Sequence, residues 1–146
     1  MYWCIVFQCL GGCNNFEKNS LQVMQNKAAR LVTHSHLRVP RKEIFSQLGW
    51  LTVRQLIFYH TALSTYRIRQ CEEPEYLSSW MSRDNDRGSI IVPNTTLSLA
   101  KDSYCYRGST QWNTIPEHIR NSEKISNFKQ KLREWILVNI NPFIDS

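Results

Sequence analysis

The sequence predicts a mainly α-helical fold: a small domain with a long central helix, a C-terminal helix and a short irregular or β-hairpin insertion. Three stretches, at about 17–33, 52–70 and 124–140, carry apolar residues at the spacing of one helical face. The chain has 146 residues, 42% of them hydrophobic and 21% charged. This composition is ordinary for one globular domain and argues against a chain that is disordered throughout.

The first predicted helix runs from about Glu17 to Thr33. One apolar stripe recurs along it, formed by Leu21, Met24, Ala28 and Leu31. Arg30 falls opposite this stripe and Lys27 beside it. A second, short helix follows, because Pro40 suits a first turn and Gly49 suits a left-handed C-terminal cap.

The long central helix is predicted to begin after Thr52, a suitable N-cap, and to reach about Gln70. Its expected buried face consists of Val53, Leu56, Ile57, His60 and Leu63. Pro74 stops it, and a short helical segment is expected over 75–81.

The middle of the chain, 89–115, changes character. The β-branched run at 90–92 and the alternation of residues 103–106 predict extended segments or one small hairpin. The final helix is predicted from about Lys124 to Ile140. Its aromatic-rich face consists of Ile125, Phe128, Leu132, Trp135 and Ile136.

Positive charge is concentrated in one part of the chain. Lys and Arg number 18 against 12 Asp and Glu, giving a net charge of +6, and the stretch from Lys27 to Arg69 alone carries +7. Such a field favours a polyanionic partner. On the long helix, one face distinct from the buried one could contact a phosphate backbone, and it comprises Arg54, Phe58, Thr61, Thr65 and Arg69. The alternative is an ordinary solvated helix surface.

The cysteines and histidines suggest a metal site only weakly. Cys4, Cys9 and Cys13 lie near His34 and His36, and zinc accepts such ligands. However, no C-x-x-C pair occurs, so free or structural thiols are favoured. We therefore predict no metal ligand.

No catalytic constellation is recognisable in the sequence. Asp84 and Asp86 are flanked by arginines and fit a solvated turn better than a cation site. His60, on an apolar face, fits a core histidine better than a catalytic base. Because there is no nucleophile elbow, P-loop or dinucleotide fingerprint, we predict no enzymatic activity for this chain alone, no cofactor and no small-molecule substrate.

Five segments in order resemble one family, and the third of them combines Tyr59-His60 with Glu73-Pro74-Glu75-Tyr76-Leu77. Residues 21–33 resemble its L-Q-x-x-Q-N-x-A-A-R-x-x-T helix, and 40–54 its next segment. Residues 107–120 are similar to R-G-x-x-x-W-N-x-L-P-x-x-I-R, and 128–132 to F-K-x-x-L. These motifs follow the polymerase domain in reverse transcriptases of non-LTR (LINE-type, jockey-like) retrotransposons, which are RNA-directed DNA polymerases.

The resemblance implies a noncatalytic fragment of such an enzyme. The chain contains no adjacent aspartates, so the metal-binding box that drives phosphoryl transfer is missing. We expect an orphaned 3′ fragment of the element's reading frame that begins at an internal methionine. Its parts would be an apolar remnant (1–16), a basic thumb-like helical part (17–82), an irregular or extended middle (83–123) and a C-terminal helix with tail (124–146).

In the parent enzyme the thumb would hold the RNA or DNA backbone without sequence specificity. The resemblance assigns this contact to Lys27, Arg30, Arg54 and Arg69. The alternative is a helical protein-interaction module with no nucleic-acid role, suggested by Trp50, Trp80, Trp112 and Trp135. Self-association through uncovered apolar surface is also expected. The apolar opening 1–10 is too short to span a membrane, so we expect an intracellular protein of the nucleus or cytoplasm.

Overall fold

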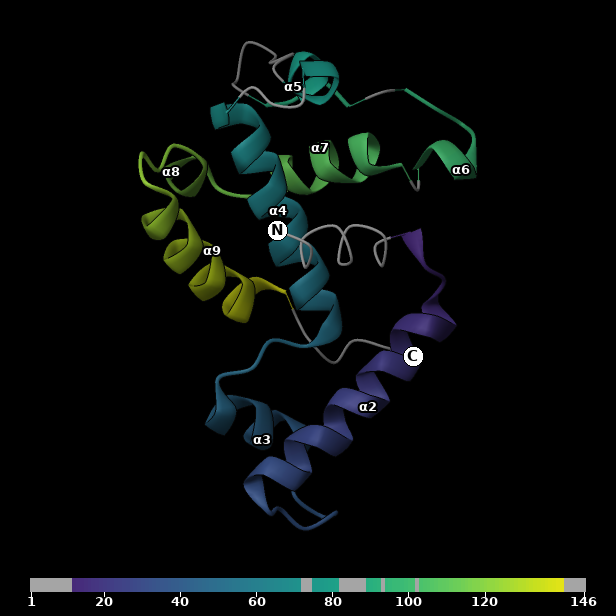
Figure 1. Cartoon of the computed structure of the whole chain (residues 1–146), viewed down its shortest axis with the longest axis vertical. Helices are drawn as coiled ribbons and strands as arrows, with labels where there is room; N and C mark the ends of the chain where they lie inside the picture. The colour runs from purple at the N-terminus through teal and green to yellow at the C-terminus, as the bar shows by residue number, and fades with distance from the viewer. Residues whose placement is uncertain (1–11, 72–74, 82–88, 93, 102, 141–146) are drawn as a thin grey trace.

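The computed structural model describes residues 12–71, 75–81, 89–92, 94–101 and 103–140, and most of these are helical (Figure 1). In chain order the helices are α2 (Asn15–Thr33), α3 (Arg41–Leu48), α4 (Val53–Cys71), α5 (Glu75–Met81), α6 (Ser98–Lys101), α7 (Tyr104–Thr114), α8 (Glu117–Arg120) and α9 (Ile125–Asn139). The predicted mainly α class is confirmed, with α4 as the long central helix and α9 as the C-terminal one.

Helix α4 is the centre of the fold. It contacts α2, α5, α7 and α9, and Figure 1 shows it standing between α9 on one side and α7 on the other. Its side chains are consequently buried or half-buried almost all round, from Val53 to Arg69. This burial explains why its apolar residues are spread over several faces.

A capping box starts α4. The Thr52 hydroxyl accepts a hydrogen bond from the Gln55 N–H at 3.4 Å, and the Gln55 side-chain oxygen accepts one from the Thr52 N–H at 3.0 Å. The predicted N-cap is therefore confirmed. The Gln55 amide nitrogen also donates to the Ile140 carbonyl at 2.9 Å, which ties the start of α4 to the end of α9.

The main core lies between α4, α7, α8 and α9. Phe128 of α9 stacks on Tyr66 of α4 with ring centroids 4.3 Å apart, and on Trp112 of α7 at 5.9 Å. The Tyr66 hydroxyl donates to the Ser122 carbonyl at 2.7 Å, so this buried phenol is satisfied. The core residues are Leu51, Ala62, Leu63, Tyr66, Ile68, Ile90, Trp112, Ile115, Ile119, Phe128, Leu132 and Ile136.

A second, smaller cluster joins α2 to α3. Ala29, Ile44 and Phe45 are buried there, and Val39, Leu48 and Trp50 pack against them. We call residues 15–50, which contain these two helices, the α2–α3 lobe. Helix α3 begins directly after Pro40 and ends at Gly49, whose φ of 62° is left-handed, as predicted for both residues.

The middle of the chain differs from the prediction. Residues 103–106 are not extended, because Ser103 caps α7 by accepting a hydrogen bond from the Tyr106 N–H at 3.3 Å. Helices α6, α7 and α8 all lie within 83–123. Ile90 does form an isolated β-bridge, and its backbone also pairs with a side chain: Asn113 accepts from the Ile90 N–H at 2.9 Å and donates to the Ile90 carbonyl at 2.8 Å.

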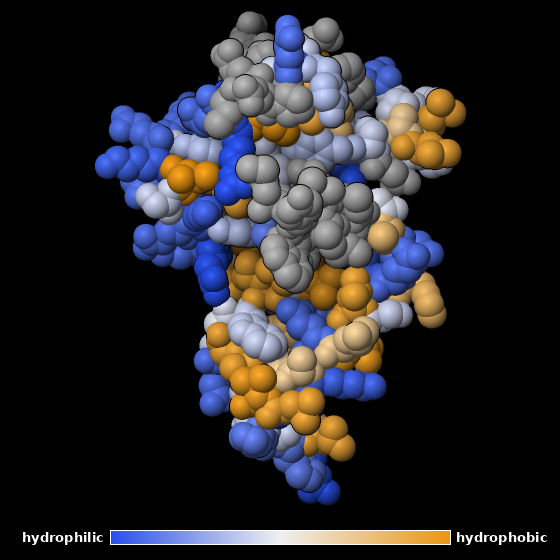
Figure 2. Space-filling model, viewed as in Figure 1, coloured by the Kyte–Doolittle hydropathy of each residue, from blue (hydrophilic) through white to orange (hydrophobic). Residues whose placement is uncertain are grey.

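The predicted apolar stripe of α2 is largely exposed instead of buried. Met24 is 66% exposed and Leu31 75%, and Ala28 is exposed as well. Only Ala29 of this helix is fully buried. Figure 2 shows the result as orange apolar surface over the lower part of the molecule, where α2 and α3 lie. A stripe of this kind normally faces a core, so its exposure needs a separate explanation.

Candidate nucleic-acid interface

The four cations predicted to hold nucleic acid are not brought together. Lys27 is exposed on α2, and Arg30 is half-buried one turn further along. Arg54 and Arg69 are half-buried on α4, where fifteen residues of helix separate them by about 22 Å. One continuous phosphate-binding surface made of these four residues is therefore absent.

Arg30 supports the local fold. Its guanidinium donates to the His36 carbonyl at 2.9 Å and to the Val39 carbonyl at 3.2 Å. These bonds hold the loop between α2 and α3 against the end of α2, where His34 takes a left-handed φ of 51°. The arginine of the family-like motif thus has an internal partner.

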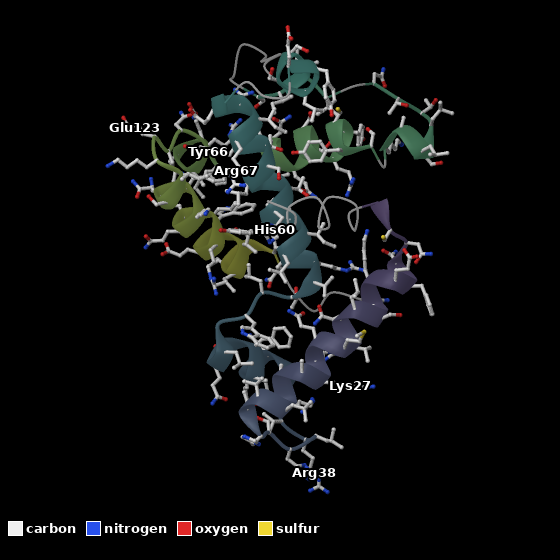
Figure 3. The ribbon with its side chains drawn as sticks, in the orientation of Figure 1. Lys27, Arg38, His60, Tyr66, Arg67 and Glu123 are labelled. Carbon is white, nitrogen blue, oxygen red and sulfur yellow. The ribbon has the colours of Figure 1, made fainter. Side chains whose placement is uncertain are left out.

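Arg69 lies at the opposite end of α4, over the Trp112 ring at 5.6 Å from its centroid. It lines a hollow of about 550 Å³ whose other lining residues are Tyr66, Gln70, Trp112, Arg120, Asn121, Ser122 and Glu123. Because Glu123 shares this hollow with the two arginines, the site is not uniformly cationic. Figure 3 shows Glu123 at the same end of the molecule as Tyr66, far from Lys27 and Arg38.

The second predicted contact face, on α4, is wrong. Thr61 and Thr65 are buried, and their hydroxyls donate within the helix, to the Ile57 carbonyl at 2.8 Å and to the Thr61 carbonyl at 3.0 Å. Phe58 packs on Trp135 with ring centroids 5.8 Å apart. Since neighbouring helices surround α4, this face contributes to packing and not to a ligand surface.

An amide network joins α2 to the start of α4. Gln25 donates to the Leu51 carbonyl at 2.8 Å, and Gln22 accepts from the Val53 N–H at 2.9 Å. Gln22 also donates to the side-chain oxygens of Gln25 and Asn26, both at 3.0 Å. The polar residues of the motif at 21–33 therefore form the inward face of α2. The spacing of three and four residues between Gln22, Gln25 and Asn26 is the sequence signal that these side chains share one face of the helix.

Exposed cations also occur in the α2–α3 lobe. No acidic residue occurs between Lys18 and Lys42. The exposed cations of this stretch are Lys27, Arg38, Arg41 and Lys42, with His34 and His36 also exposed between them. Figure 3 shows Arg38 at the lower tip of the molecule and Lys27 above it on α2. We call these four residues the lobe cations. The sequence prediction included only Lys27 of these four, although all four belong to the stretch between Lys18 and Lys42 that contains no acidic residue.

Three described titratable groups have shifted pKa values. Burial lowers the pKa of His60, and the nearby positive charge of Arg67 lowers it further. Burial raises the pKa of the Cys105 thiol, which disfavours its nucleophilic thiolate. Tyr104 has its pKa raised to about 12 by burial, although its contact with the Thr65 hydroxyl at 3.3 Å acts in the opposite direction.

In the part of the chain that the structure describes, no three His, Cys, Asp or Glu side chains are placed to hold a metal ion. Cys4, Cys9, Asp84 and Asp86 lie outside the described residues. Nor does any described helix combine the length and apolar character needed to cross a bilayer.

No protein-family model matches the chain, and neither a curated protein nor a solved structure does so.

Proposed function

We propose that this chain is a noncatalytic, thumb-like part of a non-LTR retrotransposon reverse transcriptase, which binds nucleic-acid backbone without reading base sequence. The family resemblance is supported by where its residues lie. Ala29, Trp112 and Ile119 of the quoted motifs are buried, and Gln22 and Gln25 join α2 to α4. Motifs of this kind preserve a fold, so their collinear order argues for a shared architecture.

The observation that carries the binding proposal is the group of lobe cations. They are exposed in a stretch without acids, and ammonium and guanidinium groups bind phosphate oxygens. Such contacts position a strand but carry no sequence information. This assignment keeps Lys27 from the predicted set and replaces the other three residues by Arg38, Arg41 and Lys42.

Binding should be weak and strongly dependent on salt, because it releases counterions from the nucleic acid. We would titrate a fluorescein-labelled RNA–DNA hybrid with the protein and measure anisotropy at several salt concentrations. The triple variant Lys27→Gln, Arg38→Gln, Lys42→Gln should reduce the slope of log K against log salt by up to about 2.7, at about 0.9 per lost phosphate contact.

A matched control removes three cations from another helix. Lys124→Gln, Lys129→Gln, Lys131→Gln changes the net charge equally, near and along α9, and should leave most of the slope intact. Equal losses in the two triple variants would show that only the total charge matters. The absence of binding to the hybrid at low salt would remove the nucleic-acid role.

A protein-interaction module is the second candidate. The tryptophans do not favour it, because Trp112 is buried and Trp50 and Trp135 are half-buried, while the side chain of Trp80 lies outside the described residues. The exposed stripe of α2 does favour it. For the reverse-transcriptase part we propose an intracellular location, in the nucleus or the cytoplasm, where an RNA-directed polymerase meets its template.

A further inference from the structure

Four of the five exposed large apolar residues of α2 lie on one side of the helix. They are Phe16 at 78% exposure, Val23 at 50%, Met24 at 66% and Leu31 at 75%. The fifth, Val32 at 58%, lies outside this face. We call the four residues on this face the α2 stripe. Large apolar side chains that gather on one surface usually mark a contact with another molecule.

The α2 stripe is symmetric along the sequence. Phe16 and Leu31 lie at equal distances from the midpoint between Val23 and Met24, and so do Ser20 and Lys27. In an antiparallel pair of α2 helices crossing at this midpoint, Phe16 of each copy would face Leu31 of the other. Lys27 would face Ser20. A parallel pair would instead place Lys27 against Lys27, which like-charge repulsion disfavours.

The two ends of α2 are also complementary to each other. A hollow of about 510 Å³ lies at the C-terminal end, lined by Lys27, Arg30, Leu31, His34, Ser35 and Leu37. At the other end, about 22 Å away along the helix, the exposed Phe16 precedes Glu17, whose carboxylate accepts a hydrogen bond from the Asn14 N–H at 3.2 Å. An aromatic ring with an adjacent acid suits a hollow with apolar walls and a basic rim. In the antiparallel arrangement, Phe16 of each copy meets the hollow of the other copy, so the same contact forms at both ends of the helix pair.

We propose that α2 pairs antiparallel with α2 of a second copy of this chain, and that Phe16 of each copy occupies the hollow of the other. The contact is self-complementary and therefore closes as a two-fold dimer. One helix face buries less than the roughly 800 Å² per partner of a standard interface, so we expect micromolar affinity. The proposal does not depend on nucleic-acid binding.

The first test is sedimentation equilibrium of the full chain across the micromolar range. The wild type should show a concentration-dependent dimer, and Leu31→Glu should weaken it at least about tenfold by placing a charge against the incoming Phe16. Leu137→Glu is the matched control, because Leu137 is likewise an exposed leucine, at 50%, but lies on α9. Both sites are on the surface, and circular dichroism melting should confirm that both variants fold.

The direction of the pair is tested by Ser20→Glu. In the antiparallel arrangement the introduced carboxylate faces Lys27 of the other copy, so the dimer should become tighter. In a parallel arrangement the two carboxylates would face each other and weaken it. A dimer that is unchanged or weaker in this variant would overturn the antiparallel pairing. A wild type that stays monomeric at every concentration, or an equal effect of Leu31→Glu and Leu137→Glu, would overturn the proposal as a whole.

Discussion

Phe128, Leu132 and Ile136 of α9 are completely buried in the main core, whereas α2 contributes one fully buried residue, Ala29, to the cluster in the α2–α3 lobe. The main core is held by apolar and aromatic contacts between four helices. The lobe has a small cluster of its own, and directed hydrogen bonds join Gln25 to Leu51 and Gln22 to Val53 at the start of α4.

The main core and the α2–α3 lobe therefore differ in role: the core stabilises the fold, and the lobe presents exposed side chains. Apolar burial scales with area and has no preferred direction, so the main core should supply most of the folding free energy. Amide hydrogen bonds contribute less but fix an orientation. Because α2 uses its polar side to dock, its apolar side and the lobe cations remain at the surface for other molecules.

The largest expected effect comes from truncating the centre of the main core. Phe128→Ala should lower the free energy of unfolding by about 3–5 kcal/mol, since the ring packs on Tyr66 and Trp112 and its loss leaves a cavity. Urea denaturation followed by circular dichroism would measure it. Leu137→Ala, on the exposed side of the same helix, should change the free energy by less than about 0.5 kcal/mol. Equal effects of both variants would contradict the proposed difference between core and surface.

The second prediction concerns the amide network. Replacing Gln22 and Gln25 together by alanine should cost about 1–3 kcal/mol, because the Leu51 carbonyl and the Val53 N–H lose their partners. Hydrogen exchange should show faster exchange in α2 and α3 but unchanged protection in α9. Gln130→Ala, which removes only an exposed contact with Glu134, is the control. Uniform loss of protection would mean that the lobe and the core unfold as one unit.

A smaller effect distinguishes the two roles considered for Arg30. Arg30→Ala should reduce stability by about 1 kcal/mol, because the His36 and Val39 carbonyls lose a donor that is partly in solvent. It should change the salt slope of hybrid binding less than Lys27→Ala does. A large change in slope with unchanged stability would restore Arg30 to the predicted phosphate contacts.

The smallest effect is on the pH dependence of stability. Burial holds the pKa of His60 below its usual value of 6.5, so the unfolded chain binds this proton more readily than the folded one. Stability should therefore fall as the pH drops below about 6.5, down to the folded pKa. Thermal melts of the wild type and His60→Gln between neutral and mildly acidic pH would show a shallower loss in the variant. Identical slopes would assign the acid sensitivity to other groups.

The sequence allowed the helices with strong periodicity or clear caps to be predicted. Thr52, Pro40 and Gly49 mark helix ends through local chemistry, which acts in the same way whatever surrounds it. The four-residue alternation at 103–106 was too short to outweigh a serine cap, so α7 was missed. Periodicity also identified the residues that share a face of α2. It could not reveal whether another helix covers that face.

The candidate site was harder to predict for a chemical reason. A guanidinium suits a backbone carbonyl as well as a phosphate, so the sequence alone does not separate Arg30 from Arg38. Threonines on α4 looked like polar surface, yet a helix interior satisfies their hydroxyls through its own carbonyls. The loop carbonyls of His36 and Val39 distinguish Arg30, and the packing around α4 distinguishes the threonines.

The Gln55 side chain accepts a hydrogen bond from Thr52 and donates one to Ile140, and the second bond affects how this protein folds. Its amide fastens the first turn of α4 to a carbonyl that lies 85 positions later in the chain. Closing so long a loop costs entropy before any contact compensates for it, so this contact should form late. On the ribosome, the beginning of the central helix would remain without this bond until Ile140 has been synthesised and has left the exit tunnel.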